Sequence, residues 1–285
     1  MIYEIKFQDV NTKLNVLIST FGRGIDRLKN VILDPVPCIR YTVIQQFVDE
    51  SLKAQPSFLD REDIRLVHLP GRGVTRSRNK GIELASGEIG LFADDDVTYK
   101  PHYFEKIIDT FEANKTLDIG LFKIKTPDGE PEYKKYSPDH QLITKAPSVG
   151  TIEIAFRIKP VKEKNVFFDE RFGAGNQLLV GSDEKIFVQD CLKAGLRVEY
   201  YPEYIVEHPY QSTVNSIPEY DKRKIWVTGG YDCRTNGAVA VPKAILGTFK
   251  YMPDMLKKGV NPFFYLYHRL SAVLYILQTK KRIEL

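Results

Sequence analysis

The alternation of strand and helix patterns in the first half of the chain most constrains its fold. Runs of β-branched and aromatic residues predict strands, whereas apolar residues at helical intervals predict helices. In chain order these segments are a strand at 14–20, a helix at 24–33, strands at 39–49 and 63–69, a helix at 74–86, a strand at 88–93 and a helix at 101–114. Strands that alternate with helices predict an α/β fold with a mostly parallel sheet between helices.

The pattern changes after residue 114. A polar, proline-rich segment comes first. The following segments are predicted as strands at 151–158 and 166–172, a helix at 182–194 and a strand at 197–202. Beyond residue 211 the pattern predicts helices only. We therefore predict a domain over residues 1–210 and a C-terminal helical extension over residues 211–285.

Composition is that of an ordinary globular protein, and the net charge of the 285 residues is only +4, so we expect no nucleic-acid partner. Cys38, Cys191 and Cys233 are far apart, which argues against a zinc knuckle or a disulfide scaffold and favours a reducing compartment. Residues 1–13 lack the basic and then apolar pattern of a signal peptide. We expect a cytoplasmic protein.

Three adjacent aspartates, Asp94, Asp95 and Asp96, directly follow the strand at 88–93. Neighbouring carboxylates repel one another, so a bound cation or a turn that spreads them into water must relieve the repulsion. Ligands of parallel sheets bind at the carboxyl ends of the strands. Because Thr20 and Asp49 also lie near strand ends, we expect these residues and Asp94 to line one crevice.

The acidic triplet is compatible with three interpretations. The first is a solvated turn that caps the following helix. The second is a site where a divalent metal holds a nucleotide diphosphate through carboxylate and phosphate oxygens. The third is a haloacid-dehalogenase-type phosphatase, since Asp94-x-Asp96-x-Thr98 matches the nucleophile motif of that family. That family places the motif on its first strand, whereas three strands and two helices precede it here.

Arginines upstream of the triplet favour the diphosphate interpretation. Arg72, Arg76 and Arg78 supply guanidinium groups, which pair well with phosphate oxygens. Gly71 and Gly73 allow the backbone to approach a ligand closely. A single arginine would be ordinary on a solvated helix face, but three arginines with two glycines ahead of three aspartates point more specifically to a diphosphate site.

Several motifs occur together in one order. VLISTFGR precedes FVDES, and TRSRNKGIELASGEIGLFADDD, VFFDERF and GSDEKIFVQDCLKAGLRVEYYP follow. From Leu14 to Pro209 the chain thereby resembles a family 2 glycosyltransferase with the A-type nucleotide-sugar fold, a Rossmann-like sheet. Two positions depart from the family pattern. FVDES stands where the family has VDDGS, and Ser182 replaces the Glu of its GED triplet.

The resemblance implies an inverting enzyme that needs Mn²⁺ or Mg²⁺. It would transfer a sugar from a nucleotide-sugar donor, UDP-linked in our expectation, to a hydroxyl of a glycan or a lipid-linked acceptor. By the same resemblance, Asp183 matches the general base, and Asp96 and His208 match metal ligands. The implied nucleotide-binding residues are Thr20, Phe21, Arg23, Asp49, Arg78, Asp94 and Asp95. The QxxRW signature of processive members is absent around Trp226, which favours the addition of one sugar at a time.

Other interpretations remain open for these positions. Ser182 and Asp183 are both good helix N-caps, and His208 could be a surface histidine before a proline. The departures from the family pattern leave a non-catalytic sugar-binding module as an alternative. Alternation along an extended segment further predicts that Asp94 and Asp96 point to one side and Asp95 to the other.

The last segment, residues 261–282, carries an apolar stripe at helical spacing. His268 and Arg269 interrupt the stripe, so it should not span a bilayer. It could pack on the catalytic domain, or it could lie in the membrane interface with cations on the lipid headgroups, which would make the protein peripheral on the cytoplasmic face. The flanking cations are Lys257, Lys258, Lys280, Lys281 and Arg282.

Overall fold

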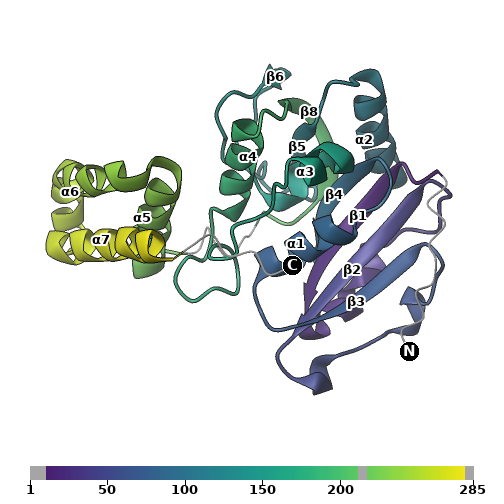
Figure 1. Ribbon diagram of the computed structural model, residues 1–285, viewed down its shortest axis with the longest axis horizontal. Helices are drawn as coiled ribbons and strands as arrows, with labels where there is room; N and C mark the ends of the chain where they lie inside the picture. Colours follow the sequence, from purple (N-terminus) through teal and green to yellow (C-terminus); the bar gives the residue numbers. More distant parts are fainter. Residues whose placement is uncertain (1–10, 211–216, 280–285) are drawn as a thin grey trace.

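The computed structural model describes residues 11–210 and 217–279. Its centre is an eight-stranded sheet in the order β3-β2-β1-β4-β7-β5-β8-β6 (Figure 1). The strands are β1 (Leu14–Phe21), β2 (Ile39–Phe47), β3 (Ile64–Pro70), β4 (Ile89–Asp94), β5 (Ile119–Lys125), β6 (Gln141–Leu142), β7 (Ile154–Arg157) and β8 (Val198–Glu207). Strands β1 to β4 are parallel to one another, whereas β7 is antiparallel to both of its neighbours and β6 to β8. The predicted α/β fold with a mostly parallel sheet is confirmed.

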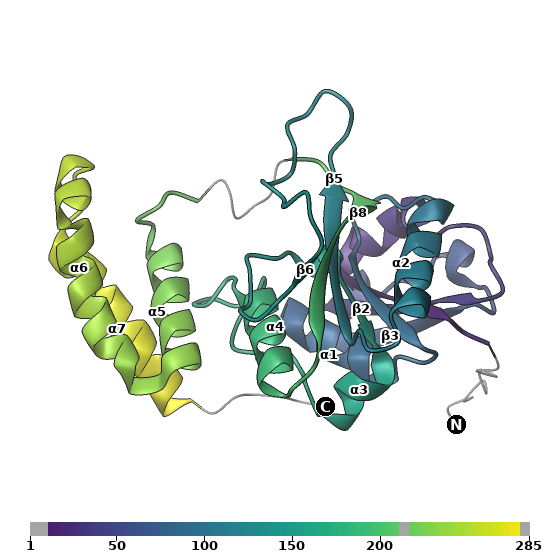
Figure 2. The same cartoon turned by 90° about the horizontal axis from the view of Figure 1, so that it is seen from above.

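Helices cover both faces of the sheet, and Figure 2 shows α2 and α4 on opposite sides of β5 and β8. Successive residues of β1 serve the two faces, since Val16 and Ile18 join one core while Leu17 joins the other. The helices of this domain are α1 (Val74–Leu84), α2 (Pro101–Ala113), α3 (Ile158–Glu163) and α4 (Asp183–Lys193), with 3₁₀ turns η1 (Gly22–Asn30), η2 (Glu50–Leu52), η3 (Ser57–Leu59) and η4 (Thr151–Glu153).

The order of the strands creates a switch point between β1 and β4. The chain runs from β1 outward through β2 to β3 and then returns to the other side of β1 as β4. Adjacent crossovers therefore leave β1 in opposite directions, which opens a crevice at the carboxyl ends of these strands. Asp94, the last residue of β4, pairs with Ser19 of β1 and so lies at this crevice.

Several local predictions differ from the structure. The strand predicted at 151–158 is confined to β7, because residues 151–153 form the 3₁₀ turn η4 and α3 begins at Ile158. The segment predicted as an α-helix at 24–33 is the shorter 3₁₀ helix η1. Residues 166–172, predicted as a strand, are irregular apart from an isolated bridge at Phe172, because several of their backbone groups bond to side chains instead of to a neighbouring strand. Asn79, for example, bonds both the N–H and the carbonyl of Phe168. Strand β5 was not predicted, although IGLFKIK is a strand-like run.

Three further helices form a unit beside the sheet domain (Figures 1 and 2). They are α5 (Lys222–Asn236), α6 (Ala240–Lys257) and α7 (Pro262–Gln278), with a 3₁₀ turn η5 (Gly237–Val239) before α6. Phe172, Leu179 and Ile186 of the sheet domain pack with Val273 and Ile276 of α7. None of the helices in the described ranges is long and apolar enough to cross a membrane.

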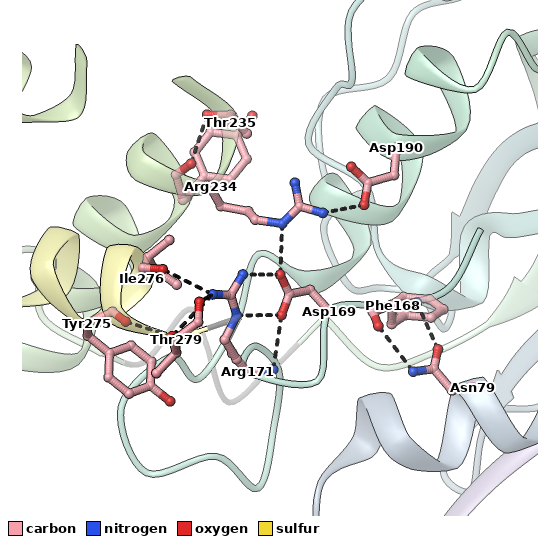
Figure 3. A network of polar contacts seen from close by, with 11 residues as sticks. Asn79, Phe168, Asp169, Arg171, Asp190, Arg234, Thr235, Tyr275, Ile276 and Thr279 are labelled. Atoms are coloured by element: carbon pink, nitrogen blue, oxygen red, sulfur yellow. Dashed lines mark hydrogen bonds and ion pairs between the residues drawn. The ribbon is translucent and has the colours of Figure 1, made fainter. Parts of the chain in front are cut away.

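A buried ionic network reinforces this junction (Figure 3). The Asp169 carboxylate is fully buried and accepts hydrogen bonds from Arg171 and from Arg234 of α5. Arg234 also pairs with Asp190 of α4, and Arg171 donates to the carbonyl of Thr279 just after α7. The network therefore connects the segment at 166–172, which matched a family motif, to both α5 and the end of α7.

Parts of some predictions fall on residues 1–10, 211–216 or 280–285, which lie outside the described ranges. They are the signal-peptide assessment, the cations Lys280, Lys281 and Arg282, and the domain boundary between residues 210 and 211. The division into residues 1–210 and 211–285 stays a prediction.

Candidate active site

The middle aspartate of the triplet, Asp95, connects the ends of β1 and β4. Its carboxylate accepts a hydrogen bond from Thr20 and forms an ion pair with Arg27 of η1. Gly24 makes this approach possible, since a Cβ atom there would lie 2.1 Å from Oδ2 of Asp95. Asp95 therefore stabilises the floor of the crevice. Neither Arg27 nor this contact was anticipated, and the only sequence signal was an arginine close to the first strand.

The third aspartate, Asp96, lies next to His208, as their Oδ1 and Nε2 atoms are 3.6 Å apart. Backbone pairing produces this proximity, because Thr98 and Glu207 exchange two hydrogen bonds and so align the chain after β4 with the end of β8. The contact with His208 lowers the pKa of Asp96, and it raises the pKa of His208. Carboxylate oxygen and imidazole nitrogen, both partly accessible, meet here at one point.

Arg78 on α1 is the central cation of the crevice. Its side chain is 6% exposed, and its guanidinium lies 2.6 Å from Asp183, 3.3 Å from Glu184 and 3.3 Å from Asp94. Helix α1 brings the cation under the end of β4, and α4 brings two carboxylates from the opposite direction. The surrounding protein raises the pKa of Asp94, an effect that Arg78 partly offsets. Three carboxylates that would otherwise repel one another are thus held together by one buried positive charge.

Asp183 is the first residue of α4, and its carboxylate is buried. Burial, together with the neighbouring charge of Glu184, raises its pKa to about 8, although Arg78 acts in the opposite direction. The N-cap interpretation holds for the position of Ser182 but is wrong for Asp183, which lies inside the helix. Ser182 is the N-cap residue but makes no capping hydrogen bond through its side chain, and Asp183 is directed at Arg78. Gly173 leaves room for this carboxylate, since a Cβ there would lie 2.9 Å from Oδ2.

Glu184 completes the acidic side of the cluster. Its Oε1 atom accepts a hydrogen bond of 2.6 Å from Thr151. Thr151 was not identified as a site residue, because nothing in its local sequence distinguishes it from other threonines. It lies in η4, which comes directly before β7. Strand β7 is the neighbour of β4 in the sheet, so the turn before β7 lies close enough for Thr151 to hydrogen-bond Glu184. This contact depends on the order of the strands.

The remaining predicted nucleotide-binding residues lie around the end of β1 and after β2. Phe21 ends β1, and the guanidinium of Arg72 lies 5.3 Å from the centre of its ring. Arg23 pairs with Asp26 on the same 3₁₀ turn. Asp49 is exposed and accepts a hydrogen bond from the backbone of Ser51, which lowers its pKa.

The structure thus groups the predicted residues into separate sets. Asp94 and Asp183 meet at Arg78, Asp96 meets His208, and Asp95 contacts Thr20 and Arg27. Strand β4 ends at Asp94, so the predicted alternation of the three side chains stays a prediction. The hydrogen bond described for Asp49 is with Ser51, and none is described with Arg78, His208 or the three adjacent aspartates. Within residues 11–210 and 217–279, no cluster of three or more His, Cys, Asp or Glu side chains is arranged to hold a metal ion.

Comparison with known proteins identifies the family of one segment of the chain. Residues 44–175 match the model of glycosyl transferase family 2, a range that includes Asp49, Arg78 and the acidic triplet. The chain contains a family 2 glycosyltransferase domain. The resemblance seen in the motifs is therefore confirmed, and the domain is that of an enzyme family. The phosphatase interpretation is not retained, because its motif lies inside the matched range.

A curated relative of this glycosyltransferase domain shares only a short segment. Over 67 residues the chain is 37% identical to the glucosyl-dolichyl phosphate glucuronosyltransferase of Haloferax volcanii, which covers 23% of this chain and 21% of that protein. The match thus covers about a fifth of the length of this relative.

Solved structures resemble the fold much more widely. The structure of S. aureus TarS residues 1–349 matches with a TM-score of 0.57 and 13% identity, over 81% of this chain and 68% of that chain. TarS structures in complex with UDP and with UDP-GlcNAc match with a TM-score of 0.54. At this identity the similarity concerns the fold, and it confirms the A-type glycosyltransferase architecture.

Proposed function

We propose that this protein transfers one sugar at a time, with inversion, from a UDP-linked donor to an acceptor hydroxyl. One observation carries the proposal. In a family 2 glycosyltransferase domain, Asp94 and Asp183 converge on Arg78 at the β1/β4 switch point, next to the pair formed by Asp96 and His208. A nucleotide-sugar reaction needs such a combination of cationic, basic and metal-binding groups at one position.

The donor nucleotide is assigned to the side of the crevice formed by β1 and β2. Asp49 would accept an N–H of the base, and Thr20 and Phe21 would line the base pocket with Arg23 at its rim. Arg78 and Asp94 would face the diphosphate and the ribose. The solved complexes of TarS with UDP and UDP-GlcNAc support a uridine donor, since this chain has the same fold.

Asp183 is the proposed general base. As the acceptor oxygen bonds to the anomeric carbon, the bond from that carbon to the diphosphate breaks, and Asp183 takes the hydroxyl proton. Displacement from the face opposite the leaving group inverts the configuration. A pKa of about 8 suits this task, because general bases work best when their pKa lies near the operating pH. Arg78 would keep the carboxylate oriented until the acceptor binds.

Asp96 and His208 would hold a divalent cation. The donor set fits Mn²⁺ or Mg²⁺ chemically, because a carboxylate oxygen and an imidazole nitrogen are directed at one point and the diphosphate oxygens can supply further ligands. Such an ion provides Lewis-acid stabilisation of the charge that develops on the leaving diphosphate. It would add to the positive charge that Arg78 and Arg27 already provide for these crowded aspartates.

The acceptor is proposed to be a glycan or a lipid-linked glycan. The name of the Haloferax volcanii relative includes a dolichyl phosphate-linked sugar, which supports the lipid-linked class. The absence of a QxxRW sequence supports addition of single sugars.

A donor panel tests the proposal. The purified protein is incubated with UDP-, GDP- and dTDP-sugars, with and without Mn²⁺, and thermal stabilisation and release of nucleoside diphosphate are recorded. We expect stabilisation by a UDP-sugar that depends on Mn²⁺, and release of UDP when an acceptor is present. Release of inorganic phosphate would indicate a phosphatase. Donor binding with no product would indicate a sugar-binding module, and either outcome would contradict the proposal.

A further inference from the structure

The outer surface of α6 and α7 is unusually apolar. Of the 17 exposed large hydrophobic residues in the described ranges, 12 lie between Val239 and Leu277. Phe263 is 81% exposed and Leu246 is 68% exposed. Exposed apolar side chains that gather in one region mark a surface that contacts something other than water. We call this surface the apolar face and define it by Leu246, Phe249, Leu256, Phe263, Tyr267 and Leu274.

Helical spacing separates this face from the packed side of each helix. On α6, Ala244, Thr248 and Met255 are buried, and the residues of the apolar face lie on the opposite side. On α7 the buried side includes Arg269 and Val273, again opposite the apolar face. Helices α6 and α7 contact each other and α5, and Figure 2 shows α5 between α6 and the sheet domain. The catalytic domain therefore does not cover the apolar face.

A groove of about 770 Å³ lies between α6 and α7 at their connection. It is lined only by uncharged residues, six of which are Ile245, Phe249, Met252, Val260, Phe263 and Leu266. Phe249 and Phe263 therefore belong both to the groove and to the apolar face. The groove extends the apolar surface inward and gives it room for aliphatic chains.

The charges around the apolar face are mostly positive. Residues 237–279 contain four exposed lysines, Lys243, Lys250, Lys257 and Lys258, against a single acidic residue, Asp254. The remaining cation of this range, Arg269, is buried and paired with Asp232 of α5. Asp254 is already paired with Lys258 and bonded by Tyr220. Lys243, Lys250 and Lys257 are exposed and repeat every seven residues, so they form one row along α6 beside Leu246. None of these three forms an ion pair with another described residue.

We propose that the apolar face docks on the surface of an anionic lipid bilayer. Apolar side chains would enter the interface, and the lysine row would contact acidic headgroups, which is the pattern of an interfacial amphipathic helix. A second copy of the chain fits less well. A twofold contact would bring the same lysine rows toward each other. The negative potential of an anionic membrane complements this row.

The proposal is independent of the proposed function, and vesicle binding without any turnover tests it. Purified full-length protein is mixed with vesicles of phosphatidylcholine, alone or with phosphatidylglycerol, and the bound fraction is measured by flotation. We expect binding that is stronger on the anionic vesicles and that weakens as salt is added, because salt screens the lysines. Binding is also expected to disappear in the double variant Phe249→Ser, Phe263→Ser.

The charge contribution is tested with a matched pair of triple variants. Each lysine near an anionic surface contributes about fivefold to partitioning, so Lys243→Gln, Lys250→Gln, Lys257→Gln should lower partitioning onto anionic vesicles about 100-fold. The control removes the same charge from exposed lysines of the sheet domain, namely Lys115, Lys159 and Lys164, and should bind as the wild type does. Circular dichroism confirms that each variant is folded.

Two results would overturn the proposal. The first is equal vesicle binding by the folded variants and the wild type, which would place the contact elsewhere. The second is a wild type that does not bind anionic vesicles at low salt but forms a dimer that Phe249→Ser, Phe263→Ser dissociates. That outcome would assign the apolar face to a second copy of the chain.

Discussion

The crevice at the β1/β4 switch point and the apolar face of α6 and α7 both depart from the usual distribution of side chains, in which charged groups are exposed and apolar groups are buried. In the crevice, Arg78 and Asp183 are ionisable groups withdrawn from water and paired with one another. On the apolar face, Phe263 and Leu246 are hydrophobic groups that remain in water. Elsewhere the sheet domain follows the common arrangement, with apolar cores on both faces of the sheet.

Each departure has an energetic cost that a ligand would relieve. Burying carboxylates near one another is unfavourable until cations neutralise them, and exposed apolar area is unfavourable until it leaves water. The two regions therefore indicate two different kinds of ligand. The crevice fits a compact, charged molecule, and the apolar face fits an extended apolar surface.

The largest effect is expected at the proposed metal site. Asp96→Ala should abolish measurable turnover and remove the Mn²⁺-dependent part of nucleotide affinity, since Lewis-acid stabilisation amounts to several kcal/mol, or about 10³-fold or more in rate. Asp95→Ala should do less to turnover but lower the melting temperature, because Thr20 and Arg27 would lose their partner. Asp109→Ala, an exposed acid on α2, is the control. A more damaging Asp95→Ala would mean that the assignment of the ligand is wrong.

Asp183→Asn should separate proton transfer from folding. General base catalysis contributes about 10²–10⁴-fold, so kcat should fall by that order while donor affinity stays nearly constant. The fold should persist, because Asp94 and Glu184 still neutralise Arg78. Turnover is measured together with the melting temperature. A fully active Asp183→Asn enzyme would remove Asp183 from the role of base and direct attention to Glu184.

The pH profile of kcat should rise toward alkaline pH. A base must be deprotonated to act, and the pKa of Asp183 is raised to about 8 by burial and by Glu184. At two units below this pKa only about 1% of the base is ionised, so the rate should be about 100-fold lower. Glu184→Gln removes a neighbouring negative charge and should shift the profile to lower pH. An unchanged profile in this variant would argue that a different group titrates.

The stability of the junction between the sheet domain and helices α5 to α7 should depend on Asp169. In Asp169→Ala, Arg171 and Arg234 lose their shared buried carboxylate, and breaking such a buried pair costs about 3–5 kcal/mol. For a chain of this size the melting temperature should fall by roughly 6–20 °C. Glu163→Ala, which breaks an exposed pair with Lys159, should cost less than about 0.5 kcal/mol. Comparable losses in both variants would show that the network adds little to the junction.

The smallest effect is expected on the apolar face. Phe249→Ser should change the free energy of unfolding by no more than about 0.5 kcal/mol, because the side chain is already exposed and the two residues have similar helix propensities. Phe92→Ala in the core of the sheet domain should cost about 3–5 kcal/mol. Denaturant unfolding measures both variants. A large loss in Phe249→Ser would mean that the apolar face is covered by the protein itself.

Local sequence patterns determined most of the elements and the identity of the site residues. The strand at 14–20, the helix after Pro101 and the acids at the end of β4 follow from periodicity and composition, since these depend on neighbours along the chain. The same patterns failed at 166–172, where apolar and aromatic residues suggest a strand. There the backbone bonds to Asn79, a residue far away in the sequence.

The tertiary structure decided which of these residues act together. Asp96 lies next to His208 because the segments around Thr98 and Glu207 pair, and Arg78 joins Asp94 to Asp183 because its side chain reaches from α1 to both the end of β4 and the first residue of α4. Local patterns do not encode the order of strands in a sheet, and contacts between distant segments depend on that order. The apolar stripe of α7 was visible in the sequence, but its position on the outside of the molecule depended on how α5 to α7 pack.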